Sequence, residues 1–170
     1  RRARSNIDLV ATCNSASAYV CGRQVGSQMH GPVRNAALSA VAGLEPFLSM
    51  DFGAATFASL LAANRKAYPQ VAQEYEGLAA GAGLSSREIF VAALSFELSQ
   101  FAQLAGFDSV HMQKPKSCTD YHSMDQQGDF RAWGHNEDSP PSELQQTYLV
   151  EANMSSFRYI GYTYAPNVVG

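Results

Sequence analysis

The chain has 170 residues, of which 46% are hydrophobic and 16% are charged, and its formal net charge at pH 7 is −3. Lys and Arg are scattered along it, which excludes the basic patch of a protein that binds nucleic acid or anionic membranes. No apolar run approaches the roughly 20 residues that a membrane-spanning helix needs. No signal peptide is visible, which favours an intracellular protein, although Arg1 in place of Met leaves a removed leader open.

The first half of the chain predicts helices. Residues 15–42 are rich in Ala, Leu, Val and Gln, with Gly31-Pro32 as the expected break. Residues 54–66 continue in the same style. Pro69 then suits the first position of a further helix, which the glycines within 81–83 should end.

A capping box follows at Ser85-Ser86-Arg87-Glu88, in which Ser85 caps the helix and Glu88 reaches back to it. The apolar face of this predicted helix continues from Ile89 to Phe101. After Gly106 the pattern changes to β-strands, the first two joined by a hairpin-type connection. The expected strands cover residues 119–123, 130–136, 147–152 and 157–164.

Helices followed by an antiparallel sheet predict an α+β layered fold. We expect a single domain over residues 1–170, with a mainly helical region at 1–117 and a sheet region at 118–170. One face of this sheet would need a covering layer that the remaining residues cannot supply. The chain is therefore expected to be the truncated N-terminal part of a larger fold.

Three cysteines are present, and their surroundings differ. Cys13 and Cys21 lie in the alanine-rich segment that is predicted to be helical. Along one helix their spacing would correspond to about 12 Å of rise, beyond the reach of a disulfide. We therefore expect two buried free thiols. Cys118 lies instead in a polar, strand-like segment and is the candidate nucleophile.

A cysteine becomes an effective nucleophile when a base takes its proton or its pKa is lowered. The side chains near Cys118 are poor candidates for that base. Lys114 and Lys116 are expected to be exposed and weakly coupled to the thiol, and His122 would lie about 13 Å away along a strand. A Cys–His pair stays open as an alternative, with His135 or His111 as the base.

Cleavage of the Ser117–Cys118 bond would supply a closer base. Cys118 would then carry a free α-amine with an ordinary pKa of about 7.7–8.0. A general base works best when its pKa lies near the working pH. The thiol could make the cut itself by attacking the Ser117 carbonyl, so the bond and the nucleophile would form one site.

Several motifs occur in order along nearly the whole chain. Together they resemble the isopenicillin N acyltransferase-like family (acyl-CoA:6-aminopenicillanic acid acyltransferases) of N-terminal-nucleophile cysteine hydrolases. The motifs are Gly22-Arg23-Gln24-Val25-Gly26 followed by Gln28, the series from Tyr68-Pro69 through Glu74, Gly77-Leu78-Ala79 and Gly81-Ala82-Gly83-Leu84-Ser85, then Phe96-Glu97-Leu98, Cys118-Thr119, and Gly134-x-Asn136-x-Asp138.

The resemblance implies the N-terminal part of an αββα sandwich and assigns roles to the residues around Cys118. Cys118 would be the autoprocessing and catalytic nucleophile, and Ser117 would end the small subunit. Asn136 and Asp138 would support catalysis, and the oxyanion-hole asparagine would lie beyond Gly170.

Two positions depart from the family's pattern. Ser117 stands where Gly is common, and Asp120 stands where a small hydroxyl residue is common. Thr119 and Asp120 are expected to contact the substrate. Outside the resemblance, Asp138 before Ser-Pro-Pro is also a common turn residue, and Asn136 at a strand end can simply satisfy backbone groups.

The function expected from these residues is that of a self-processing amidohydrolase or N-acyltransferase. It would act on a small amide, of the β-alanyl-amine type by resemblance, or on an acyl-CoA. We expect no cofactor and no metal, because no zinc-like spacing occurs. Small and large subunits would come from one precursor, with a homo-oligomer left open. The alternatives are a Cys–His hydrolase without backbone processing and a non-catalytic binding domain.

Overall fold

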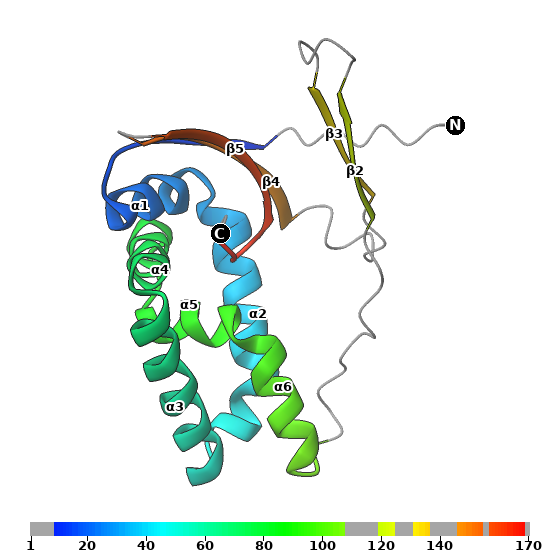
Figure 1. The fold of residues 1–170 in the computed structure, drawn as a ribbon. Helices are drawn as coiled ribbons and strands as arrows, with labels where there is room; N and C mark the ends of the chain where they lie inside the picture. Colours follow the sequence, from blue (N-terminus) through cyan, green and yellow to red (C-terminus); the bar gives the residue numbers. More distant parts are fainter. Residues whose placement is uncertain (1–8, 108–118, 125–130, 137–145, 155–156, 169–170) are drawn as a thin grey trace.

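The computed structural model describes residues 9–107, 119–124, 131–136, 146–154 and 157–168 (Figure 1). Over these ranges the protein is mixed α and β, with helices in the first part and most strands in the second. The α+β class is therefore confirmed. The elements in chain order are β1 (Val10–Asn14), α1 (Ala18–Gln28), α2 (His30–Leu48), α3 (Asp51–Ala67), α4 (Pro69–Ala82), α5 (Ser86–Ala93), α6 (Ser95–Leu104), β2 (Thr119–Met124), β3 (Arg131–Asn136), β4 (Thr147–Met154) and β5 (Phe157–Tyr164).

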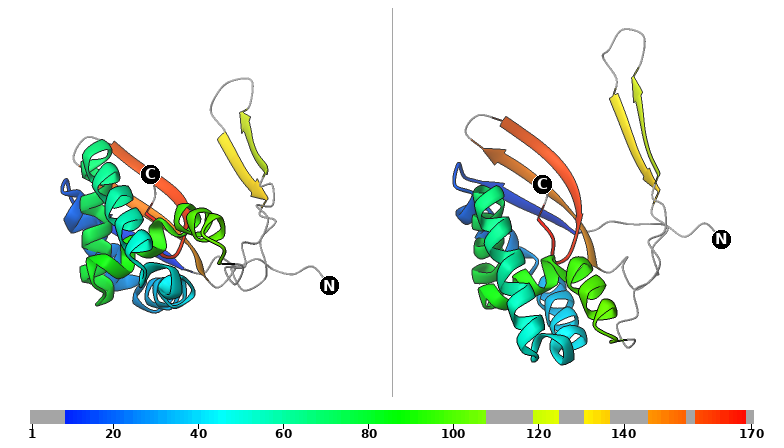
Figure 2. Two further views of the ribbon diagram at one scale, coloured as in Figure 1. Left: turned by 90° about the horizontal axis from the view of Figure 1, so that it is seen from below. Right: turned by 60° about the horizontal axis from the view of Figure 1, so that its bottom comes forward.

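The strands form two separate sheets. One has the order β1-β4-β5, with β4 and β5 antiparallel and β1 parallel to β4. The other is the antiparallel hairpin of β2 and β3. Figures 1 and 2 show this hairpin standing apart from the three-stranded sheet. The prediction of a purely antiparallel sheet was wrong for β1, which reaches β4 from the other end of the chain.

The strand β1 was not predicted from the sequence, because Cys13 was assigned to an alanine-rich helical segment. Its residues alternate in burial, with Ala11 and Cys13 buried and their neighbours exposed. Five residues are too few for periodicity to identify a strand. The strand forms because β4 offers it a partner, with Val10 opposite Leu149 and Asn14 opposite Asn153.

The expected helix over 15–42 is two helices, and the break lies at Met29 rather than at Gly31-Pro32. Pro32 is the third residue of α2. A proline in the first turn of a helix costs no hydrogen bond, because the N–H groups there have no intrahelical partner. The proline therefore follows the break instead of causing it, and Gly31 is helical as well.

The helix starts and stops in the next segment follow the sequence closely. Pro69 is the first residue of α4, and Gly83 ends it in the left-handed conformation with a φ of 66°. The capping box is present in full: the Ser85 backbone N–H donates to Glu88 Oε2 at 2.7 Å, and the Glu88 N–H donates to Ser85 Oγ at 3.2 Å. These two predictions are confirmed.

The helix that starts at Ser85 does not continue to Phe101. It ends at Ala93, and α6 begins after Leu94, whose ψ of 14° leaves the helical range. The reason lies in the packing, because Leu94 and, further along α6, Leu98 and Ala102 belong to a second apolar core. That core consists of Leu44, Phe47, Leu48, Val91, Leu94, Leu98 and Ala102.

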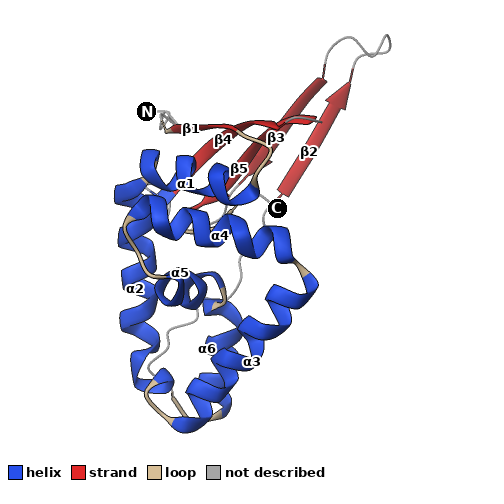
Figure 3. Ribbon diagram, turned by 90° about the vertical axis from the view of Figure 1, so that its left-hand side faces the viewer, coloured by secondary structure: helices blue, strands red, loops and turns tan. Residues whose placement is uncertain are grey.

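The main core lies between the three-stranded sheet and the helices beneath it. In Figure 3, α1 and α4 lie directly under the sheet, and α3, α5 and α6 lie further from it. The sheet contributes Tyr148, Val150 and Ala152, which are buried, while Glu151 and Asn153, which alternate with them, are exposed. One face of this sheet is thus covered by helices.

Candidate functional site

The hairpin of β2 and β3 brings part of the predicted site together. Thr119, which follows Cys118 in the sequence, lies directly opposite Asn136 in the backbone register, and Asp120 lies opposite His135. The expected strand end at Asn136 is therefore paired with the expected strand start. Thr119 and Asn136, the members of the two motifs that the structure describes at this point, thus meet at one end of the hairpin.

The remaining predicted site residues lie outside the described residues. These are Ser117, Cys118 and Asp138. The structure accordingly gives a backbone pairing for Thr119, Asp120 and Asn136 and no side-chain geometry at the cleavage site. Among the histidines considered as bases, His122, which follows Cys118 by four residues in the sequence, pairs with Trp133, and His135 lies opposite Asp120. His111 lies outside the described residues.

The prediction of two free thiols at Cys13 and Cys21 was wrong. The two cysteines form a disulfide, with their Cα atoms 5.1 Å apart and both side chains buried. The geometric argument failed at its premise, because Cys13 lies on β1 and Cys21 lies on α1. Between β1 and α1 the chain reverses direction at residues 15–17, and Ser17 caps α1. The two cysteines therefore do not lie along one helix, and no helical rise separates their sulfur atoms.

This disulfide leaves Cys118 as the one cysteine outside it among the three in the chain. A disulfide takes two of the thiols out of nucleophilic chemistry. The sequence could not distinguish the three on that basis. The pairing therefore narrows the candidate nucleophile to one position.

The glycines of the first two family-like motifs have a packing role. A Cβ on Gly22 would lie 2.0 Å from the Glu74 carbonyl oxygen, and one on Gly77 would lie 2.0 Å from the Tyr19 oxygen. Gly26 and Gly81 meet the facing backbone in the same way. The spacing of four on both helices lets α1 and α4 run parallel with their backbones in contact.

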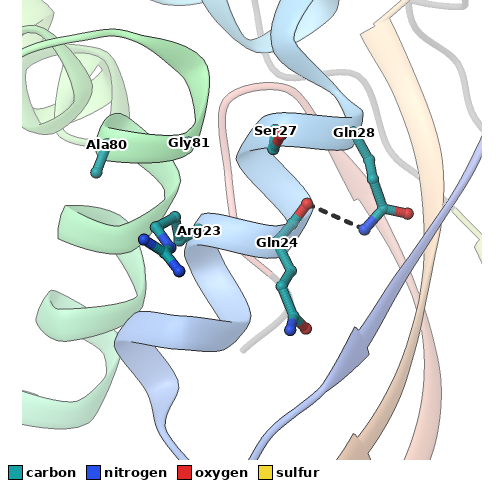
Figure 4. A pocket seen from close by; sticks show the side chains of 6 residues that line it. All are labelled: Arg23, Gln24, Ser27, Gln28, Ala80 and Gly81. Carbon is teal, nitrogen blue, oxygen red and sulfur yellow. Dashed lines mark hydrogen bonds between the residues drawn. The ribbon is translucent and has the colours of Figure 1, made fainter.

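A polar hollow of about 500 Å³ lies along α1 and α4 (Figure 4). Arg23 points toward α4, while Gln24 and Gln28 point toward β1. The hollow is lined by Arg23, Gln24, Ser27, Gln28, Ala80 and Gly81.

Gln28 and Gln24 act on the edge strand β1, a role that the sequence did not reveal. The Thr12 N–H donates to Gln28 Oε1 at 3.0 Å, and Gln28 Nε2 donates to the Thr12 carbonyl oxygen at 2.7 Å. Gln24 Oε1 accepts from the Asn14 N–H at 2.9 Å. The two side chains satisfy backbone groups that a neighbouring strand would otherwise use, so they protect this edge of the sheet.

A polar cluster links α4 to the strands β4 and β5. The hydroxyls of Tyr148 and Thr163 both donate to the Asn167 carbonyl oxygen, at 3.1 and 3.2 Å, and the Tyr75 hydroxyl lies 3.5 Å from Asn167 Oδ1. Glu74 lies beside these tyrosines, and burial raises its pKa to about 7. Burial, with the Glu74 charge as a lesser cause, also raises the pKa of Tyr148 and of Tyr159.

The described ranges contain neither a metal-binding cluster nor a membrane-spanning helix. No group of three His, Cys, Asp or Glu side chains there is placed to hold a metal ion. No helix there is both long and apolar enough to cross a membrane. In comparisons with known proteins, no family model matches the chain and no curated protein matches it. The function proposed for this chain therefore rests on its own residues.

Proposed function

We propose that this chain carries the nucleophile of a self-processing N-terminal-cysteine amidohydrolase or N-acyltransferase, built as part of an αββα sandwich. The observation that carries the proposal is the hairpin register, in which Asn136 pairs with the residue that follows Cys118. A catalytic cysteine at a strand start needs polar groups nearby to orient its new ammonium group. Asn136, the last residue of β3, would supply one such group at this end of the hairpin, and Asp138 would supply a second by the sequence resemblance.

The availability of the thiol supports the same proposal. Cys13 and Cys21 are joined to each other, so Cys118 has no cysteine partner within this chain. A thiol that is free to ionise is the form that attacks carbonyl carbon.

Self-processing begins with attack of Cys118 Sγ on the carbonyl carbon of Ser117. The C–N bond to the Cys118 nitrogen breaks, the thiol proton passes to that nitrogen, and a thioester joins Ser117 to the sulfur. Water then hydrolyses the thioester. Ser117 keeps a carboxylate, and Cys118 keeps a free thiol and a free α-amine.

Catalysis uses the group that processing creates. The α-amine of Cys118 accepts the thiol proton, because its ordinary pKa of about 7.7–8.0 lies near neutral pH. The thiolate attacks the carbonyl carbon of a small amide or of an acyl-CoA thioester, and the proton passes to the leaving amine or thiol. The resulting thioester on Cys118 is resolved by water in a hydrolase or by an amine in an acyltransferase. Thr119 and Asp120, next to the nucleophile, would contact the substrate, and a β-alanyl amide is the class that the sequence resemblance favours.

Alkylation of the native protein provides a direct test of the nucleophile. In the naturally encoded protein that contains this chain, iodoacetamide without reductant should label Cys118 and abolish amide hydrolysis or acyl transfer in parallel. Prior incubation with substrate should slow both losses. A single label at Cys118 with full activity retained would exclude the acyl-enzyme mechanism and leave a role in which Cys118 is incidental.

The variants Cys118→Ala and Cys118→Ser separate this mechanism from its rivals. Cys118→Ala should lose both chain cleavage and activity, whereas Cys118→Ser should keep a slow reaction because the hydroxyl is a weaker nucleophile. A Cys–His hydrolase would need an intact Ser117–Cys118 bond and would lose activity on His135→Ala. A binding domain would tolerate all three substitutions.

A further inference from the structure

A second pocket, distant in the sequence from Cys118, lies where four helices meet. It has a volume of about 190 Å³ and opens between the end of α3, the start of α4, α5 and the start of α6. This is smaller than the roughly 300–1,000 Å³ typical of sites for drug-sized ligands. We call it the Glu97 pocket. It is lined by Asn64, Tyr68, Val71, Ala72, Tyr75, Phe90, Ala93, Leu94 and Glu97.

The pocket has a buried apolar floor and an open rim. Ala72, Phe90 and Leu94 are buried in the floor. Tyr68 at the rim is 62% exposed, and Glu97 is exposed as well. Three aromatic side chains therefore line a small space that solvent can enter, and the rings of Tyr75 and Phe90 lie 5.6 Å apart.

Two polar side chains of the pocket, Glu97 and Asn64, present acceptor oxygens. In the described part of the chain, Glu97 takes part in no hydrogen bond and no ion pair. Asn64 uses its Nδ2 to donate to the Leu60 carbonyl oxygen at 3.0 Å, which leaves its carboxamide oxygen as an acceptor. A carboxylate and a carbonyl oxygen beside aromatic rings are complementary to a ligand that carries N–H donors and a positive charge.

The nearby arginine does not neutralise Glu97. Arg65 donates to Glu76 Oε1 at 2.8 Å, and its guanidinium lies 5.3 Å from the centroid of the Phe90 ring. Phe90 thus already stabilises one positive charge through its ring. The negative charge of Glu97 is also felt within the pocket wall, since it contributes to the raised pKa of Tyr75, after burial and the charge of Glu74.

We propose that the Glu97 pocket binds a small organic ammonium ion, with Glu97 and Asn64 accepting from its N–H groups and Tyr68, Tyr75 and Phe90 surrounding its carbon skeleton. The volume corresponds to about six water molecules at roughly 30 Å³ each, so the ligand has on the order of six to ten non-hydrogen atoms. This site is independent of the chemistry proposed for Cys118.

Three probes of nearly equal shape test the proposal by calorimetric titration at pH 7: benzylammonium, benzyl alcohol and benzoate. Benzylammonium should bind at least fivefold more tightly than benzyl alcohol, and benzoate should not bind. Glu97→Gln should weaken benzylammonium at least fivefold and leave benzyl alcohol unchanged. The matched control Glu151→Gln changes an exposed carboxylate on β4 and should leave both affinities unchanged.

The outcomes distinguish this proposal from the one for Cys118. Cys118→Ala should bind benzylammonium as the unmodified protein does, so loss of catalysis leaves the test intact. Tyr68→Leu should weaken benzylammonium more than benzyl alcohol, because only the cation is attracted to the ring face. Equal binding of the cation and the alcohol, or benzylammonium binding that Glu97→Gln leaves unchanged, would overturn the proposal. Retention of the wild-type melting temperature shows that each variant is folded.

Discussion

At the scale of single residues, Glu74 is the carboxyl group whose ionised form is disfavoured most clearly in the folded protein. It is a residue of α4, and its charge acts on Tyr148 of β4 and Tyr159 of β5. The hydroxyls of Tyr75 and Tyr148 engage Asn167 rather than the carboxylate. Burial raises its pKa from the ordinary value of 4.5 to about 7. The folded protein therefore binds the proton of Glu74 more tightly than the unfolded chain does, and it is destabilised when that proton leaves.

This shift predicts a pH dependence of stability with a defined sign. The contribution of Glu74 is most favourable below the unfolded pKa and is lost as pH rises through the folded pKa of about 7. The side chain keeps some contact with solvent, so we expect a loss of about 1–2 kcal/mol across this window rather than the full value of the shift.

The variant Glu74→Gln should remove that pH dependence. Urea unfolding gives the free energy of unfolding of the wild type and of the variant at pH 5 and at pH 8. The change in this free energy between the two pH values is then compared between the two proteins. Glu74→Gln should be more stable than the wild type at pH 8 and close to it at pH 5. Glu45→Gln, which removes a surface carboxylate paired with Arg87, is the control and should follow the wild type. Parallel curves for Glu74→Gln and wild type would contradict the burial of this charge.

At the scale of elements, the predictions that depend on neighbouring residues were confirmed, and those that depend on residues far apart in the sequence were wrong. The capping box at Ser85, Pro69 at the start of α4 and Gly83 at its end depend on a few neighbouring residues, so local chemistry determines them. The strand β1 depends on β4, more than a hundred residues away, and no local pattern announces it. The error over Cys13 and Cys21 follows directly from missing that strand.

The contact between α1 and α4 gives a prediction with a built-in control. A methyl group on Gly77 would lie 2.0 Å from the Tyr19 oxygen, so Gly77→Ala must push the helices apart. We expect it to cost about 2–3 kcal/mol of unfolding free energy. A methyl group on Gly43 of α2 would have no neighbouring atom within 4 Å. Gly43→Ala should therefore stabilise the protein by about 0.5–1 kcal/mol through helix propensity.

Urea denaturation of the two variants checks this prediction. Opposite signs for Gly77→Ala and Gly43→Ala are the expected result. A Gly77→Ala protein as stable as the wild type would mean that α1 and α4 are not in backbone contact. In that case helix packing would not explain the glycines of α1 and α4.

At the scale of the whole molecule, the three-stranded sheet has helices on one face and exposed apolar groups on the other. Ile160 is 72% exposed and lies opposite Glu151 in the register, on the face away from the helices. Val10 at the edge strand is exposed on the same side, opposite Leu149. A second layer over this face, as the αββα proposal requires, would bury these side chains.

The candidate site was predictable from sequence only as a list of residues. The pairing of Thr119 with Asn136 agrees with the expected hairpin, because two short strands with a polar connection determine their own register. The role of Cys118 as the one cysteine outside a disulfide required the tertiary structure. So did the Glu97 pocket, whose residues come from four helices and share no motif.

Intact mass spectrometry of the naturally encoded protein tests the central claim most directly. We predict two chains from one precursor, one ending at Ser117 and one beginning at Cys118, and a single uncut chain for Cys118→Ala. An enzyme that is fully active while its Ser117–Cys118 bond stays intact would contradict the account.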